Sequence, residues 1–471
     1  MTTLISADPI AHLLRRATFG PTPAALAEAA RLGVAGWLDR QLDPERIDDP
    51  VCDAVLDRLP LATAPIATVR ARLPVHSYAA FKQLGQATVA RAAWSNRQLF
   101  EMTALFWANH LHVAAPSNGV WDSRGDYEAT VIRRHAFGRF ADMLKASVRH
   151  PAMLTYLDNR SSTKAHPNEN YARELMELHT VGMIYGEDDV LAAARLLTGM
   201  TVTKSGTYAY SPAKHAIGAV EILGFRHANA TADGGEAAAM AFADHLARHT
   251  ATARRIATKL CLRFVDDEPP ASLVATLAKV YLDNDTAIVP VLRALFTSAE
   301  FAAATGRKIR TPFEDLTATI RALGLGPETS GVKALGGLYE SLVNAGNAPH
   351  RWGPPNGFPD VAAAWASPSA FLQRCNLHLN LATGWYPSQL TRPADLLGSL
   401  VPVLPGTYGG LVDALATRLV GTRLPAPHTA AVLSVAGKLP TSSLTAGDRS
   451  LGGSLPYLIA LVLDSPSFQL R

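Results

Sequence analysis

Residues 237–264, AAAMAFADHLARHTATARRIATKLCLRF, decide the fold class of this chain. In the second half of the stretch, Ala253, Ile256, Ala257 and Leu260 recur at i, i+3, i+4 and i+7, which is the spacing of one face of an α-helix. The same spacing runs through Pro23–Leu42, Ala237–His249, Ala251–Phe264 and Leu273–Leu282. The pattern therefore predicts a mainly α protein.

Alternating β-branched patterns, which indicate strands, are scarce in this sequence. The short candidates are Thr201–Thr203 and Ala219–Leu223, which flank a Gly/Ser/Tyr-rich loop and are placed to pair as one small hairpin. We therefore expect a large multi-helical globular fold with a small loop/β-hairpin insertion. Residues 1–200 form a helical region that carries the main polar motifs, and residues 201–236 form a loop-rich insertion. A second helical region spans 237–386 and contains a Trp/Pro/Gly-rich loop at 347–360, and a C-terminal helical region spans 387–471. We expect the four regions together to form one compact unit.

The composition excludes several classes of protein. The chain has 471 residues, 48% of them hydrophobic, which is enough for a large buried core. Lys+Arg 44 against Asp+Glu 40 gives a net charge of only +4, and without a dense basic tract we expect no nucleic-acid partner. Three widely separated cysteines, Cys52, Cys261 and Cys375, form neither a CxxC zinc module nor a disulfide framework.

The hydrophobic pattern bears on the location of the protein. Residues 1–16 lack the apolar stretch of a signal peptide, and the chain has no apolar run near the ~18 residues that cross a bilayer. We expect a protein without membrane insertion that is cytoplasmic as written, with export left open.

The densest polar cluster is HPNENYARELMELH at 166–179. Pro167 suits the first turn of a helix, and Glu169 near that start complements the helix dipole. On such a helix the polar residues Asn170, Arg173, Glu174 and Glu177 share one face.

Two interpretations of this polar face stay open. It is either a solvated amphipathic surface or the wall of a cleft in which two close carboxylates separate their pKa values. In the second case Arg173 orients Glu174 and Glu177, while Asn168 and Asn170 donate neutral hydrogen bonds to a ligand.

A second cluster, FWANHLH, occupies residues 106–112 and contributes Trp107, Asn109 and His110 as binding candidates. His110 is either a base or ligand or a structural residue at a helix end. Glu101 lies nine residues earlier and would point the opposite way on a continuous helix, which weakens a di-metal site of the Glu-x-x-His kind.

The third cluster, RWGPPNGFPD at 351–360, is followed by Trp365. Trp352 and Trp365 on a stiff Pro/Gly loop suit either the rim of a cleft, where an aromatic face stacks on a sugar, or a buried packing loop. Asp360 is the carboxylate of interest there. The sequence has no G-x-x-x-x-G-K-[ST], G-x-G-x-x-G after a strand, H-E-x-x-H or G-x-S-x-G motif.

Taken together and in order, these clusters resemble the bacterial DUF1800 family. The matching segments are HLLRRATFGP at 12–21, FWANH at 106–110, RHAFG at 134–138, HPAM at 150–153, LDN at 157–159, PNENYARELMEL at 167–178, LTG at 197–199, Lys308, TPFE at 311–314 and GFPD at 357–360. The resemblance implies a mostly helical fold and a family with many exported members. It implies no catalytic residues, because the family's function is unknown, although it adds Asp158 and Asn159 to the binding candidates.

The chain departs from the family pattern at three places. His179 stands where the family usually has an aromatic residue, which argues against an essential metal ligand there. Met200 replaces the tryptophan of a Leu-Thr-Gly-Trp pattern, and His215-Ala216 stands where the family has a His-Asp pair, so a role needing that carboxylate is in question.

The leading hypothesis is a hydrolase that uses a carboxylate pair, possibly for glycosidic bonds of a carbohydrate polymer. The candidate catalytic residues are Glu174, Glu177, Glu169 and Asp360. The candidate residues for binding a small-molecule or oligosaccharide substrate are Asn168, Asn170, Arg173, His110, Asn109, Trp107, Trp352, Trp365, Asp158 and Asn159. We expect no cofactor and no metal site.

Two alternatives remain open. One is a metal-dependent enzyme in which a divalent metal takes ligands from His110, Glu169, Glu174 and Glu177. The other is a non-catalytic binding or assembly protein in which the Asn/Glu/Arg helix forms a buried structural network.

Overall fold

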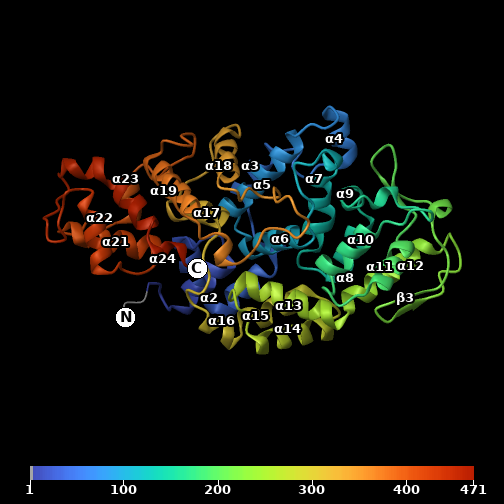
Figure 1. The fold of residues 1–471 in the computed structure, drawn as a ribbon. Helices are drawn as coiled ribbons and strands as arrows, with labels where there is room; N and C mark the ends of the chain where they lie inside the picture. The colour runs from blue at the N-terminus through green and yellow to red at the C-terminus, as the bar shows by residue number, and fades with distance from the viewer. Residues whose placement is uncertain (1–3) are drawn as a thin grey trace.

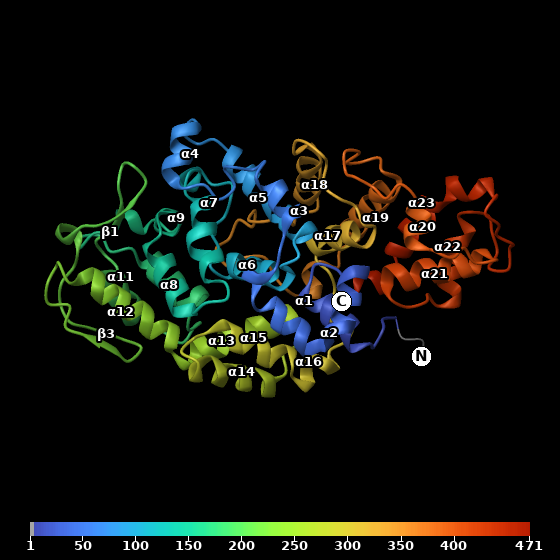
Figure 2. The same cartoon turned by 180° about the vertical axis from the view of Figure 1, so that it is seen from behind.

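The computed structural model describes residues 4–471 and is mainly α-helical, which confirms the predicted fold class (Figure 1). Over these residues the chain forms twenty-four α-helices and two two-stranded antiparallel sheets. The molecule is elongated, with the C-terminal helices at one end and the two sheets at the other (Figures 1 and 2).

The first segment of the chain leads to the helix that carries FWANH. Its elements are α1 (Pro9–Ala17), α2 (Pro23–Gln41), η1 (Pro44–Arg46), α3 (Pro50–Leu56), α4 (Ile66–Arg72), α5 (Ala79–Trp94) and α6 (Gln98–His110). The helix predicted at 23–42 has the expected ends, but non-helical backbone at Gly33 (φ 71°, ψ 170°) kinks it into two helical pieces. Thr22 caps it by accepting the Ala25 N–H, and Pro23 occupies the first position, where no N–H is needed.

The central segment carries the polar motif. Its elements are η2 (Asn118–Val120), α7 (Arg124–Tyr127), η3 (Glu128–Arg133), α8 (Phe140–Arg149), α9 (Pro151–Tyr156), η4 (Asn159–Ser161), α10 (Glu169–Glu174), η5 (Leu175–His179) and α11 (Glu187–Leu196). Two of these, η3 and η5, are π-helical turns. Such turns are rare overall, but those that occur are often found at functional sites.

The loop-rich insertion contains two hairpins where the sequence predicted one. β1 (Met200–Val202) pairs with β2 (Tyr208–Tyr210), and β3 (Val220–Ile222) pairs with β4 (Phe225–His227). The two predicted strands therefore do not pair with each other, because each finds an antiparallel partner nearer in the chain. η6 (Pro212–Lys214) lies between the hairpins.

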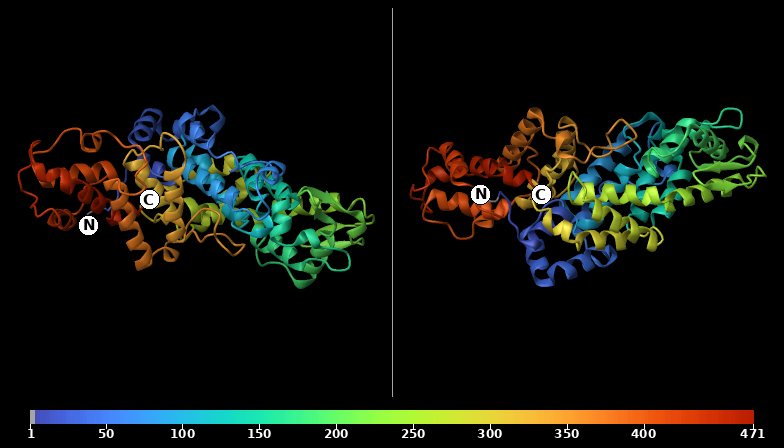
Figure 3. Two further views of the ribbon diagram at one scale, coloured as in Figure 1. Left: turned by 90° about the horizontal axis from the view of Figure 1, so that it is seen from above. Right: turned by 60° about the horizontal axis from the view of Figure 1, so that its bottom comes forward.

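The next segment confirms the three remaining predicted helices to within two residues at each end. Its elements are α12 (Gly235–Arg248), α13 (Thr250–Phe264), α14 (Ala271–Asp283), α15 (Ile288–Phe296), α16 (Ala299–Ala303), α17 (Pro312–Ala322) and α18 (Lys333–Asn344). α13 packs along α14 at one long edge of the molecule (Figures 1 and 3). Side chains of α13 also contact the end of α6 and η5.

The C-terminal segment packs on α17 through α19. Its elements are η7 (Ala362–Ala364), α19 (Pro368–Thr383), α20 (Leu396–Leu400), α21 (Tyr408–Val420), α22 (Ala426–Ser434), α23 (Arg449–Leu463) and α24 (Pro466–Gln469). Buried apolar side chains form a cluster that includes both Leu13 and Phe468. The three cysteines are free thiols. Within residues 4–471, no helix has the length and apolar character needed to cross a membrane.

Candidate functional site

The polar motif begins with a capped helix. The Asn168 side chain accepts the Tyr171 N–H at 3.0 Å and donates to the Leu157 carbonyl at 2.8 Å. α10 therefore starts at Glu169, and Pro167 precedes the helix where the sequence placed it in the first turn. Both the oxygen and the nitrogen of the Asn168 amide are hydrogen-bonded to the backbone around the N-terminus of α10. We therefore assign Asn168 a capping role and not a ligand-binding role.

The carboxylates of Glu174 and Glu177 lie half-buried where α10 passes into η5. Burial, and then the negative charge of Glu177, raises the pKa of Glu174. The Tyr185 hydroxyl donates a hydrogen bond to Glu177 Oε2. The two carboxyl groups thus interact electrostatically and have different surroundings, which is the arrangement that separates an acid from a base.

The rest of the predicted polar face is more exposed. Arg173 forms an ion pair with Glu187 at 2.9 Å, and its guanidinium lies 5.9 Å from the centre of the Tyr185 ring. Glu169 and Asn170 are exposed at the first turn of α10. This half-open face does not form a buried Asn/Glu/Arg network.

The π-helical turn η5 changes the geometry that the sequence predicted. An ideal α-helix repeats every 3.6 residues, whereas a π turn bonds i to i+5 and inserts extra backbone. The Thr180 hydroxyl closes the turn by donating to the Leu175 carbonyl at 2.7 Å. The simple i, i+3 relation between Glu174 and Glu177 therefore does not describe their positions.

The end of α6 packs against η5 and α13 through His110. His110 Nε2 donates to the His179 carbonyl at 3.0 Å, and the Lys259 ammonium donates to His110 Nδ1 at the same distance. Burial, and then the charge of Lys259, lowers the pKa of His110 well below its usual value. His110 is a neutral, buried connector with both ring nitrogens occupied, and neither is free for a metal.

Trp107 and Asn159 also have structural roles. Trp107 is fully buried, donates its indole N–H to the Ala136 carbonyl at 3.1 Å, and packs on Phe140. Asn159 is fully buried and donates to the Leu197 carbonyl at 3.2 Å, next to Asp158, which is exposed with φ 58°. Neither buried side chain is available to a substrate.

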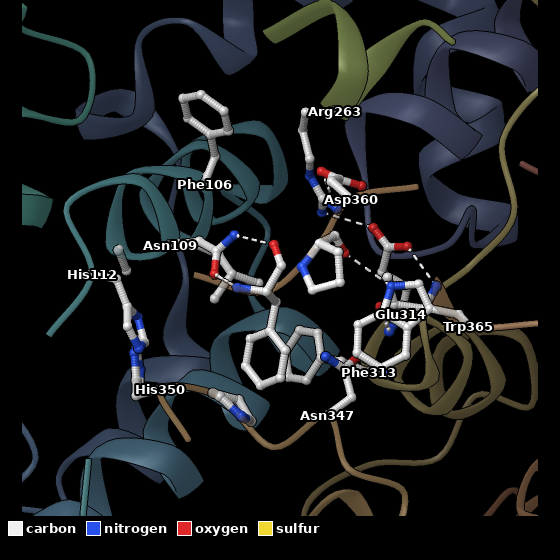
Figure 4. Close-up of a pocket in the computed structure, with 16 residues that line it drawn as sticks. Phe106, Asn109, His112, Arg263, Phe313, Glu314, Asn347, His350, Asp360 and Trp365 are labelled. Atoms are coloured by element: carbon white, nitrogen blue, oxygen red, sulfur yellow. Dashed lines mark hydrogen bonds and ion pairs between the residues drawn. The ribbon is translucent and has the colours of Figure 1, made fainter. Parts of the chain in front are cut away.

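Asn109 holds the 347–360 loop in place. Its amide donates to the Phe358 carbonyl at 2.9 Å and accepts the Phe358 N–H at 2.7 Å, as the dashed lines in Figure 4 show. Gly357 has φ 73°, and a Cβ there would lie 2.2 Å from the Asn109 carbonyl oxygen. The two motifs that contain these residues, FWANH and GFPD, therefore belong to one structural unit.

Both tryptophans pack near Phe358. Trp352 is half-buried, packs on Phe358 with ring centres 5.1 Å apart, and donates to the Asn356 side chain at 2.9 Å. Trp365 is only 9% exposed and donates to the Pro359 carbonyl at 3.0 Å. Trp352 is thus more exposed than Trp365, which mainly packs the loop.

A pocket opens between α6, α13, α17 and this loop (Figure 4). It encloses about 650 Å³, open mouth included, and its lining includes Phe106, Asn109, Arg263, Glu314, Asp360 and Trp365.

The charges beside this pocket are paired with one another. Arg263 lies 2.7 Å from Glu314 and 3.5 Å from Asp360, and Arg471 lies 2.9 Å from Glu314. Burial alone would raise the pKa of Glu314, but Arg263 and Arg471 lower it to about 2. Lys308 also approaches Asp360, at 3.7 Å. Asp360 therefore belongs to a compensated ionic network, which gives it an anchoring role.

Sequence reasoning missed Arg263, Lys259 and the roles of Glu314 and Lys308. Glu314 and Lys308 stand within family-like segments, which was the available signal. Arg263 and Lys259 look like ordinary polar positions of an amphipathic helix, because their partners are distant in the chain.

Tyr156 connects the polar helix to the aromatic loop. Its hydroxyl donates to the Gly353 carbonyl at 2.9 Å. Burial chiefly raises the pKa of Tyr156, and the charge of Glu174 adds to the shift. His112 Nε2 donates to the neighbouring Trp352 carbonyl at 2.8 Å. The structure thus brings the Trp352 end of the loop toward Glu174, while Asp360 lies at the separate pocket.

Metal ligands do not cluster in the described structure. Over residues 4–471, no three His, Cys, Asp or Glu side chains converge in a way that could hold a metal ion.

These features define a large, mainly α-helical protein with a half-buried carboxylate pair where α10 passes into the π-helical turn η5 and with an aromatic loop reaching toward it. A family model described as "Protein of unknown function (DUF1800)" matches residues 12–470, and the chain belongs to this family. Comparisons with curated proteins and with solved structures gave no match.

Proposed function

We propose that this protein is a hydrolase that cleaves a glycosidic bond of a carbohydrate with Glu174 and Glu177. The observation that carries the proposal is the different environment of the two carboxyl groups. Glu174 is half-buried and its pKa is raised by burial and by the charge of Glu177, whereas Glu177 accepts a hydrogen bond from Tyr185.

The different environments support different roles for the two carboxyl groups. Burial and the charge of Glu177 raise the pKa of Glu174, which is the direction that favours a proton donor, so Glu174 is the proposed general acid that protonates the leaving oxygen. The Tyr185 hydrogen bond holds the carboxylate of Glu177 in place beside Glu174, so Glu177 is the proposed base or nucleophile. Tyr185 positions Glu177.

The aromatic loop supplies the sugar-binding surface. The Trp352 side chain is partly exposed, and aromatic faces stack on the apolar faces of sugar rings. Tyr156 links this loop to the surroundings of Glu174 through Gly353. A sugar stacked on Trp352 would extend toward the carboxylate pair.

The test is a polysaccharide panel with Glu174→Gln and Glu177→Gln, each shown to be folded by its circular dichroism and melting temperature. We expect each substitution to lower kcat by at least about 100-fold, the usual contribution of an acid or base. Asp188→Asn is the matched control, because Asp188 is an exposed carboxylate in the first turn of nearby α11. Full activity in both folded Gln variants would overturn the proposal.

A further inference from the structure

Three positively charged residues recur along one edge of α13, at Arg255, Lys259 and Arg263. Spacing of four residues keeps them on one side of the helix, and the row spans about 12 Å at 1.5 Å per residue. Arg263 is compensated by Glu314 and Asp360. Arg255 and Lys259 have no such ion pairs in the described structure.

Arg255 and Lys259 have no carboxylate within ion-pair distance among residues 4–471. Arg255 Nε contacts the Leu178 carbonyl at 3.4 Å, and the Lys259 ammonium contacts only the neutral ring of His110. Both side chains are partly buried. Partly buried cations without a counter-ion are unfavourable, and a bound anion would relieve that cost.

The surroundings of this pair are also electropositive. Burial, and then the charge of Arg255, lowers the pKa of Lys259 to about 8. His179 is 1% exposed, its Nε2 has no hydrogen-bond partner in the described structure, and the charges of Lys259 and Arg255 add to burial in lowering its pKa to about 3. A buried polar atom without a partner is rare in native proteins and calls for a ligand or a water.

This group of cations adjoins the proposed catalytic pair. Burial chiefly lowers the pKa of Arg255, and the charge of Glu177 opposes that shift, so the two side chains lie close enough to interact. Leu178 and His179, which contact Arg255 and His110 through their carbonyls, directly follow Glu177 on η5. An anion held by Arg255 would therefore lie next to the scissile bond.

We propose that Arg255 and Lys259, with His179 beside them, form a subsite for the carboxylate of an acidic sugar unit. The sugar component of this inference rests on the proposed glycosidic function, whereas the anion component rests on two partly buried cations that have no carboxylate within ion-pair distance in the described structure. A guanidinium binds a planar carboxylate through two parallel hydrogen bonds, and the lysine adds a third charge-assisted contact. The preferred substrate class is thus a uronic-acid polymer.

The experiment is calorimetric titration of the Glu174→Gln protein, which allows binding to be measured without turnover. The probes are a galacturonic-acid trisaccharide, the neutral galactose trisaccharide and inorganic phosphate. We expect the acidic trisaccharide to bind at least about 10-fold more tightly than the neutral one. Adding Arg255→Gln should weaken its binding about 10- to 100-fold, as expected for charge-assisted hydrogen bonds.

Matched variants make the test specific. Arg254→Gln removes an exposed arginine from the adjacent position of the same helix and should leave the affinity unchanged. Lys259→Gln should weaken binding like Arg255→Gln, and Arg255→Gln remains informative if Lys259→Gln fails to fold. Equal affinities of the Arg255→Gln and Arg254→Gln proteins for the acidic trisaccharide would overturn the subsite.

The remaining outcomes separate this inference from the function it extends. Tighter binding of phosphate than of the trisaccharide would overturn the sugar as the source of the anion. Arg255-dependent binding of the trisaccharide, with no hydrolysis by the wild-type protein, would support the subsite and count against the hydrolase.

Discussion

His378 joins the C-terminal helices to the body of the molecule through two carboxylates. The side chain on α19 is 1% exposed, with Nε2 at 2.9 Å from Asp315 of α17 and Nδ1 at 2.7 Å from Asp464, which follows α23. Burial alone would lower the pKa of His378, but the two aspartates raise it from 6.5 to about 9. The imidazolium is therefore the stable form in the folded protein at neutral pH.

The raised pKa makes the stability of the protein depend on pH. A group with a folded pKa above its unfolded pKa contributes its full stabilisation below pH 6.5 and loses it as the pH rises through about 9. At 1.36 kcal/mol for each pKa unit, the shift of His378 corresponds to roughly 3 kcal/mol. His378→Gln removes this contribution at every pH.

The assay is urea unfolding of wild type and His378→Gln between pH 6 and pH 9.5, followed by circular dichroism. The difference in unfolding free energy between the two proteins should shrink by about 2–3 kcal/mol across this range. His166→Gln is the control, because His166 is exposed and makes no side-chain ion pair in the described structure. Parallel pH profiles for wild type and His378→Gln would refute the reasoning.

Three further predictions concern other buried groups. Glu101→Gln breaks the paired contacts of 2.7 and 2.8 Å with Arg133 and should lower the free energy of unfolding by about 3–5 kcal/mol; a loss below about 1 kcal/mol in urea unfolding would contradict a buried ion pair. Gly357→Ala places a Cβ 2.2 Å from the Asn109 carbonyl oxygen, so hydrogen exchange of the surrounding loop should accelerate at least about 10-fold, and unchanged exchange would contradict the close contact. Burial raises the pKa of Cys52, so its thiol should stay unmodified by a thiol reagent in the native protein at pH 8 and should react in urea. Mass spectrometry measures the modification, and rapid labelling of the native protein would be inconsistent with that burial.

The helices could be predicted because their signal is local. The apolar repeat of Thr250–Phe264 and its neighbours depends only on which side of each helix faces the core, and the observed ends differ from the predicted ends by two residues or fewer. The hairpins could not be assigned correctly, because strands of three residues leave too few positions to specify a partner.

The contacts of the candidate site residues could not be predicted from the sequence. Glu174 and Glu177 are near enough for the charge of Glu177 to raise the pKa of Glu174, but the π turn that sets their relation leaves no recognised mark in the sequence. Asn109 has the composition of a ligand-binding residue and instead holds Phe358, 249 residues away in the chain. Contacts of that sequence separation follow from tertiary packing, which spacing along one helix does not encode.

Charge compensation distinguishes the two polar regions of this protein. Beside the pocket, Glu314 and Asp360 are matched by Arg263, Arg471 and Lys308, so a proton on either carboxylate would leave buried cations uncompensated. The pKa of Glu314 is about 2 because protonating it would remove the partner of these cations. Glu314 is therefore a poor proton donor or acceptor near neutral pH. Where α10 passes into η5 the balance is reversed, because the pKa of Glu174 is raised and nearby Arg255 has no carboxylate within ion-pair distance in the described chain. Proton transfer and anion binding both cost least where charges are incompletely paired, and this favours the wall at Glu174 over the pocket as the place of the proposed reaction.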